Sequence, residues 1–144
     1  MKMSTKGRYS LRAVIDIAAN MGGEPVSARC IAERANMSEG YLLQLLRHLK
    51  DAGIVNSVRG ASGGYILAKP PTDITVGEIF RAVGEPVEPV ECAGIVEGGF
   101  CEESEKCRAK EAWRQLNAGI AKILDEITIA SLFTEETEAA EDPA

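Results

Sequence analysis

The sequence predicts a mainly α-helical protein, built as a winged helix-turn-helix unit with a long C-terminal helix attached. Two patterns indicate this fold class. Three short amphipathic helices precede a β-hairpin, and an aliphatic stripe runs over about five helical turns near the C-terminus. Hydrophobic residues make up 45% of the 144 residues and aromatic residues only 5%, so the core is expected to be aliphatic.

The first two helices are indicated by apolar periodicity and by residues that start or stop a helix. Between Ser10 and Met21, apolar side chains recur at spacings of three and four residues, which is typical of an amphipathic helix. Gly22 and Gly23 end this helix. Ser27 then caps a second, short helix. The apolar face of this helix comprises Ala28, Ile31, Ala32 and Ala35.

The third helix has well-marked ends. Ser38 is a favourable N-cap, and Gly53 stands just after the expected last turn at about Ala52, where a C-terminal glycine is common. The buried face is expected to consist of Leu42, Leu45, Leu46 and Leu49. The outward positions are then Glu39, Gly40, Leu43, Gln44, Arg47 and Lys50, with Tyr41 at the boundary.

A hairpin and one more short helix follow. The β-prone segments Ile54–Val58 and Tyr65–Leu67 flank the glycine-rich sequence RGASGG, which predicts a hairpin, the wing of the fold. Thr75 and Glu78 have the spacing of a capping box, which predicts a helix that runs to about Val83. We therefore expect a winged helix-turn-helix domain over residues 1–83.

The remainder divides into a cysteine-containing loop over residues 84–107, a long helix over 108–133 and an acidic, disordered tail over 134–144. The apolar stripe of the long helix comprises Trp113, Leu116, Ile120, Ile123, Leu124 and Ile127. A stripe of this length exceeds what one small domain can easily cover, so we expect it to pair two subunits. The alternative is packing against its own domain.

The net charge is −6, but the charges are unevenly distributed. Residues 1–69 carry ten Lys/Arg against five Asp/Glu, whereas residues 70–144 carry six against seventeen. A basic unit joined to an acidic one is a pattern of nucleic-acid-binding proteins. No apolar run approaches the roughly 20 residues of a membrane helix, and the N-terminus has no signal-peptide pattern. We expect a cytoplasmic protein without a membrane partner.

A helix-turn-helix unit inserts the start of its second helix into the major groove of DNA, and here this is the helix that follows Ser38. Gln44 can pair with adenine. Arg47 and Lys50 are candidate phosphate contacts, and Arg59 is placed to enter a minor groove. The predicted contacts with double-stranded DNA are Ser38, Gly40, Tyr41, Leu43, Gln44, Arg47, Lys50, Arg59 and Gly60. The alternative is a basic helix and a glycine-rich turn with no nucleic-acid partner.

Three of the four cysteines, Cys92, Cys101 and Cys107, lie in one acidic, glycine-rich segment. Four interpretations are open. Ordinary buried thiols suit such a polar segment poorly, and neighbouring glutamates disfavour the thiolate that a redox switch needs. Zinc sites often use closer cysteine pairs. An iron–sulfur cluster accepts thiolates from longer loops. Cys30 lies off the apolar face of its helix and is expected to be a bystander.

Several segments resemble the winged-helix family of IscR-type iron–sulfur regulators, which also includes NsrR and CymR. The resemblance spans roughly residues 1–133, and RGxxGGY in the wing is distinctive. It implies a homodimer on a near-palindromic operator, an iron–sulfur cluster on Cys92, Cys101 and Cys107, and base contacts from Gly40, Leu43 and Gln44. The similar segments are STKGRY, SEGYLLQLL, AGIVNSVRGASGGYIL, ITVGEI and ECAGIVEGGFCEESEKC.

The chain departs from this family pattern at three positions. Lys110 stands where IscR relatives have a histidine, Arg8 stands where NsrR relatives have an aspartate, and Leu43 replaces a glutamate found in some relatives. The fourth cluster ligand and the cluster type are therefore open. The only histidine, His48, is expected at the surface of the recognition helix.

The expected function is a DNA-binding transcription regulator whose operator binding responds to the cluster. The alternatives are a cluster-free regulator that acts through thiol oxidation or a protein partner, and an iron–sulfur electron carrier. With a single histidine, no phosphate-binding glycine loop and no paired carboxylates in an apolar setting, an enzyme is not expected.

Overall fold

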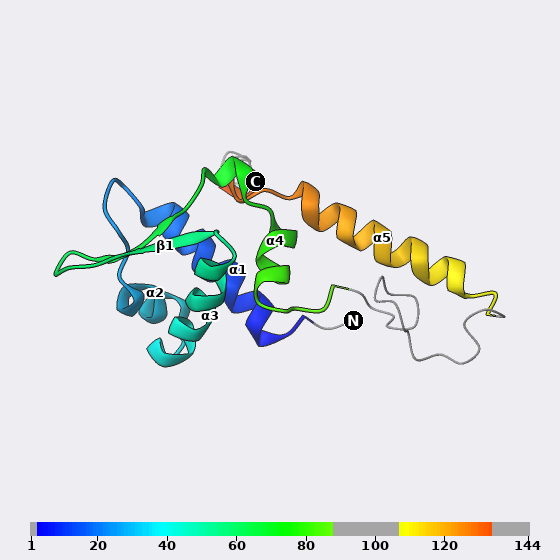
Figure 1. Cartoon of the computed structure of the whole chain (residues 1–144), viewed down its shortest axis with the longest axis horizontal. Helices are drawn as coiled ribbons and strands as arrows, with labels where there is room; N and C mark the ends of the chain where they lie inside the picture. The colour runs from blue at the N-terminus through cyan, green and yellow to red at the C-terminus, as the bar shows by residue number, and fades with distance from the viewer. Residues whose placement is uncertain (1–2, 88–106, 134–144) are drawn as a thin grey trace, which may run out of the picture.

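The structure, a computed structural model, describes residues 3–87 and 107–133. Four helices and a hairpin form a compact head, and a fifth helix projects from it (Figure 1). We use "head" for α1–α4 with the hairpin. The elements are α1 (Thr5–Asn20), α2 (Ala28–Ala35), α3 (Glu39–Asp51), β1 (Val55–Val58), β2 (Gly64–Leu67), a 3-10 turn (Pro71–Asp73), α4 (Val76–Ala82) and α5 (Lys110–Glu126).

Helix α1 begins at Thr5, so the predicted start at Ser10 is wrong. Ser4 is the N-cap, and its hydroxyl accepts the backbone N–H of Gly7 at 3.3 Å. The first turn is polar and therefore carries no apolar periodicity, which is why the pattern missed it. Ser10 itself lies inside the helix and is fully buried.

The helix-turn-helix unit forms as the capping residues predict. The Ser27 hydroxyl accepts the N–H of Cys30 at the start of α2. Asn36 ends that helix with a left-handed backbone (φ 54°), a conformation that asparagine tolerates better than most residues. Ser38 then caps α3. Because the connection is so short, α2 and α3 pack directly against each other.

The wing is a two-stranded antiparallel hairpin in which Val55 pairs with Leu67 and Val58 with Gly64. A third segment joins it, which no local pattern in the sequence predicts. Val26 and Tyr65 form an isolated bridge, with N–H···O distances of 2.9 and 2.8 Å. A side chain at Gly64 would collide with the Val26 backbone, so a glycine is needed there for the wing to attach to the segment before α2.

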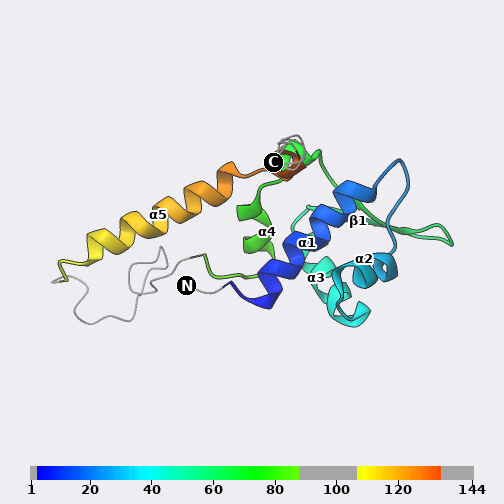
Figure 2. The ribbon, with the colours of Figure 1, turned by 180° about the vertical axis from the view of Figure 1, so that it is seen from behind.

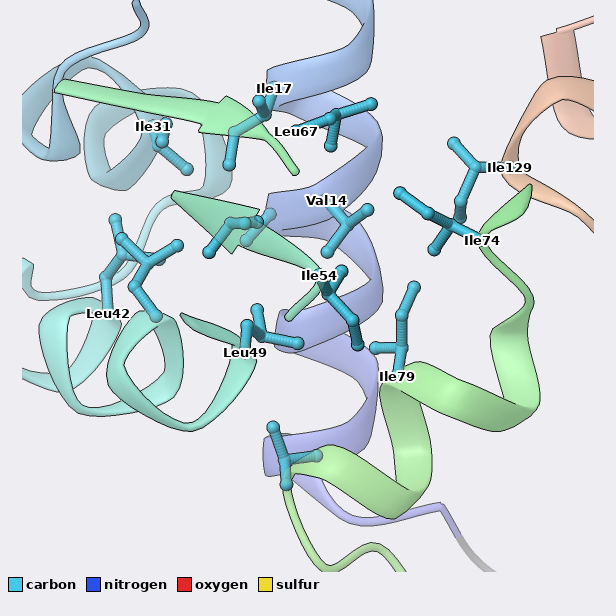
Figure 3. Packing of buried hydrophobic residues seen from close by; sticks show 14 of the residues in the cluster. Val14, Ile17, Ile31, Leu42, Leu49, Ile54, Leu67, Ile74, Ile79 and Ile129 are labelled. Carbon is cyan, nitrogen blue, oxygen red and sulfur yellow. The ribbon is translucent and has the colours of Figure 1, made fainter. Parts of the chain in front are cut away.

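The core is aliphatic, as expected, and side chains from every part of the head meet in it (Figure 3). It also contains Ile129, which follows α5 in the sequence and is fully buried. The N–H of Ile129 donates to the carbonyl of Ile74 at 2.9 Å, and the N–H of Val76 donates to the carbonyl of Ile127 at 2.9 Å. The chain after α5 therefore returns to the head and completes its core.

The junction between α4 and α5 sets how the long helix leaves the head. Thr75 and Glu78 form the predicted capping box at the start of α4. One turn later Arg81 donates two hydrogen bonds, both 2.8 Å, to the two carboxylate oxygens of Asp125 in α5. Gly77 allows this approach, because a Cβ there would meet the Asp125 carboxylate. The C-terminal end of α5 lies against the head, and its first turn lies far from it (Figure 2).

Within residues 3–87 and 107–133, no helix combines the length and the apolar character that crossing a membrane requires.

Candidate nucleic-acid interface and cysteine segment

The outward face of α3 carries side chains that can contact DNA bases. Gly40, Gln44 and Arg47 are exposed, and the Leu43 side chain is 43% exposed. An exposed leucine among polar residues offers an apolar surface for a thymine methyl group. The opposite face, made of Leu42, Leu45, Leu46 and Leu49, is buried in the head.

The start of α3 is open to solvent. The Ser38 hydroxyl oxygen accepts the N–H of Tyr41 at 3.2 Å, and its own O–H remains available as a donor. Unpaired N–H groups at a helix start attract phosphate. Glu39, the first residue of α3, is exposed and places an acidic group at this helix start.

Tyr41 is half-buried, and it contacts α1 as well as facing solvent. Its ring meets the ring of Tyr9 edge-on, with centroids 6.3 Å apart and an interplanar angle of 82°. The guanidinium of Arg12 lies over the Tyr9 ring, 5.7 Å from its centroid. Tyr41 therefore connects the recognition helix to the side of α1.

The wing presents Arg59 at the end of β1, exposed to solvent. Gly60 follows with a φ of 116°, which a residue with a side chain rarely adopts. At the other end of α3, the Lys50 ammonium donates to the Ser57 hydroxyl of β1 at 2.8 Å. Lys50 thus links the end of the recognition helix to the first strand of the wing.

The cationic side chains of the head fall into two groups. Arg34 donates two hydrogen bonds of 2.7 Å to Asp16, and Arg29 pairs with Glu33 at 3.3 Å. By contrast, no carboxylate in the described parts of the chain pairs with Arg47 or Arg59. These two cations, on the recognition helix and the wing, keep their charge available for a phosphate backbone.

Of the three cysteines predicted to bind a cluster, Cys92 and Cys101 lie outside the described residues. Cys107 is exposed with a free thiol, three residues before α5 begins at Lys110. A free, exposed thiol fits a metal ligand. Among the described residues alone, no three His, Cys, Asp or Glu side chains converge on a possible metal position.

The other two residues discussed with the cysteines lie on the head. Cys30 is exposed on α2, as expected, and His48 is exposed in the last turn of α3.

Glu85, at the start of the cysteine segment, has a role that the sequence does not reveal, and it is only 4% exposed. Its carboxylate accepts hydrogen bonds from the Ser4 backbone N–H at 2.8 Å and from the Ser4 hydroxyl. Burial alone would raise the pKa of Glu85. The hydrogen bonds from Ser4, a further hydrogen bond from the Gly7 N–H and the positive charge of nearby Lys6 outweigh burial, so the pKa is lowered overall. No local pattern predicts such a contact, because the two partners are 81 residues apart in the chain.

Known proteins resemble the chain over almost its whole length. The E. coli O1:K1 HTH-type transcriptional regulator IscR is 39% identical over 136 residues, which cover 94% of this chain and 82% of that protein. The solved structure of T. potens IscR has a TM-score of 0.78 at 40% identity and covers 100% of this chain and 94% of its own. The structure of CymR, the global cysteine regulator of B. subtilis, has a TM-score of 0.75 at 38% identity, with coverages of 94% and 98%.

The solved structures confirm the predicted winged helix-turn-helix fold. The similar proteins are transcription regulators, which confirms the prediction that the chain is not an enzyme. The model of the Rrf2 family, described as an iron-dependent transcriptional regulator, matches residues 3–135. The chain therefore belongs to the Rrf2 family of DNA-binding helix-turn-helix transcription regulators.

Proposed function

We propose that the protein is a homodimeric regulator that recognises a near-palindromic operator and whose operator binding is modulated by an iron–sulfur cluster. DNA binding is supported by two surfaces of the head whose arginines form no ion pair with a carboxylate of the described residues. These are the solvent face of α3, with Gln44 and Arg47, and the wing tip, with Arg59. The two surfaces belong to elements that pack against each other, α3 and β1, and the Lys50–Ser57 hydrogen bond also joins these elements. The major groove suits α3, and a narrow minor groove suits Arg59.

The dimer is supported by the apolar stripe of α5. Leu124 and Ile127 pack against the core of the head. Farther along the helix, Trp113 is 37% exposed, Leu116 44% and Ile123 58%. Large apolar side chains in a row on a projecting helix stabilise a protein only when another surface covers them. A second copy offers the same stripe, and twofold pairing of this kind matches the symmetry of a palindromic operator.

The cluster is supported by the donor set and by the relatives. Cys92, Cys101 and Cys107 would supply three thiolates, which suit iron–sulfur chemistry, and two of the similar proteins are IscR. When bound, such a cluster supplies a centre whose state depends on iron supply and on oxidants. Cys107 joins α5, and α5 is held to α4 by the Arg81–Asp125 ion pair. Ordering of the cysteine segment by a cluster would therefore change the angle between α5 and the head.

A second candidate is regulation without a cluster, through thiol oxidation or a protein partner. The observation in its favour is the similarity to CymR, the global cysteine regulator of B. subtilis. The two candidates differ in metal content.

The experiment that separates them is iron and sulfide analysis of anaerobically reconstituted protein. We expect visible absorbance, bound iron and bound sulfide in the wild type and in the matched control Cys30→Ser on α2. In Cys107→Ser we expect the absorbance, the iron and the sulfide to be lost. Colourless wild-type protein after reconstitution would exclude the cluster. Equal iron in the two serine variants would exclude Cys107 as a ligand.

A further inference from the structure

Helix α1 carries two exposed arginines, Arg8 and Arg12, that form no ion pair within the described residues, and Arg12 is the one that lies over an aromatic ring. Arg12 is exposed, and no carboxylate in residues 3–87 or 107–133 forms an ion pair with it. Asp16 could form an ion pair with Arg12, because it lies four residues further along α1, the spacing at which helical side chains meet. Both oxygens of Asp16 are instead bound by Arg34 of α2, each at 2.7 Å. The structure thus leaves Arg12 as a cation with no acidic neighbour to neutralise it.

The position of Arg12 is fixed by an aromatic contact. Its guanidinium lies 5.7 Å from the centroid of the Tyr9 ring, within the range of a cation–π interaction. Tyr9 in turn meets Tyr41 of α3 edge-on at 6.3 Å. A guanidinium that is stacked on a ring loses less freedom when it binds than a free one does. The stack therefore preorganises Arg12 beside the first turn of the recognition helix.

The geometry of the DNA groove indicates what Arg12 meets. The major groove is about 12 Å wide, so a helix in it is flanked on each side by a phosphate backbone. Contacts of 6.3 and 5.7 Å link Tyr41, in the first turn of α3, to the guanidinium of Arg12. The Arg12 guanidinium therefore lies no more than about one groove width from the Tyr41 ring in the first turn of α3. The starts of α1 and α3 also lie along the same edge of the head in opposite views (Figures 1 and 2).

We infer that Arg12, held by Tyr9, binds a DNA backbone phosphate at the edge of the major groove that α3 enters. The contact extends the DNA interface from α3 and the wing onto α1. Since a phosphate carries no base identity, Arg12 positions the head on the duplex and strengthens binding to all sequences alike. This inference rests on the proposed DNA binding by the head.

The test is the salt dependence of DNA binding by the full-length protein, measured with a selected operator and with an unrelated duplex between about 50 and 200 mM salt. Arg12→Gln removes the charge at an exposed position and should leave the melting temperature unchanged. We expect it to weaken binding to both duplexes by the same factor. The slope of log K against log salt should become shallower by about 0.9 for each phosphate that the protein no longer neutralises, or about 1.8 for a dimer.

Three variants make the result specific. Arg114→Gln makes the same charge change on exposed α5 and should keep the wild-type slope. Tyr9→Phe retains the ring and should also keep it, whereas Tyr9→Leu should reduce it in part. A slope for Arg12→Gln equal to that of Arg114→Gln, with Arg59→Ala still defective, would overturn the inference and leave the proposed function intact. Wild-type protein with no salt-dependent DNA binding would overturn both.

Discussion

The carboxylate of Glu85 accepts the backbone N–H of Ser4 at 2.8 Å, which fixes the start of α1 to the residue where the cysteine segment departs from α4. Gly7 lies against the same side chain, since a Cβ there would be 2.8 Å from Cγ of Glu85. One turn further along α1, Tyr9 touches Tyr41 of the recognition helix. The first turns of α1 therefore contact both the lead into the cysteine segment and the DNA-facing helix.

This arrangement predicts an acid-dependent stability. The pKa of Glu85 is lowered in the folded protein, so its stabilising effect is full above the unfolded carboxyl pKa of about 4.3 and is lost as the pH falls through the lower folded value. Glu85→Gln should cost about 1–2 kcal/mol at pH 7. The cost should shrink below about pH 4, as measured by urea unfolding. Glu24→Gln, at an exposed position, should cost nothing, and a Glu85→Gln cost that does not change with pH would contradict the account.

The wing depends on the absence of a side chain at Gly64. Gly64→Ala should destabilise the protein by about 1–3 kcal/mol, because the added methyl group would push the hairpin away from the Val26 backbone. Gly22→Ala is the matched control, since a Cβ there meets nothing within 4 Å. Denaturant unfolding of both variants gives the comparison, and equal stability would show that Gly64 does not need to approach Val26 closely.

The stripe of α5 predicts the oligomeric state. Sedimentation of the wild type should give twice the 15.4 kDa mass of the chain. Ile123→Asn replaces the most exposed apolar side chain of the stripe, which is 58% exposed in the single chain, and should shift the protein toward monomer at micromolar concentration. Ala118→Asn introduces the same residue at an exposed position on the other side of the helix and should remain a dimer. Dimers of equal strength in both variants would place the interface elsewhere.

The wing arginine predicts a large loss of affinity. Arg59→Ala should weaken operator binding by about 1–3 kcal/mol, or roughly 5- to 150-fold, if Arg59 enters the minor groove. Arg114→Ala on α5 changes the same charge away from the head and should bind as the wild type does. An identical footprint and affinity for Arg59→Ala would rule out the minor-groove role.

The sequence was informative where local chemistry decides the structure. Ser27, Ser38 and Thr75 cap helices as predicted, since a capping residue acts on the turn that follows it. The sequence was uninformative where contacts between residues far apart in the chain determine the structure. The Val26–Tyr65 bridge and the return of Ile129 to the core depend on tertiary packing. The solvent face of α3 could be predicted from the leucine spacing, whereas the free charge of Arg12 depends on Arg34 binding Asp16.

The central claim is that a cluster on the cysteine segment changes operator binding, and operator affinity measured anaerobically with and without the reconstituted cluster tests it most directly. A coupling of about 1–3 kcal/mol predicts that the two affinities differ about 5- to 150-fold. The difference should disappear in Cys107→Ser and persist in Cys30→Ser. Equal affinities of the loaded and cluster-free wild type, at matched salt and with iron and sulfide confirmed in the loaded sample, would contradict the account.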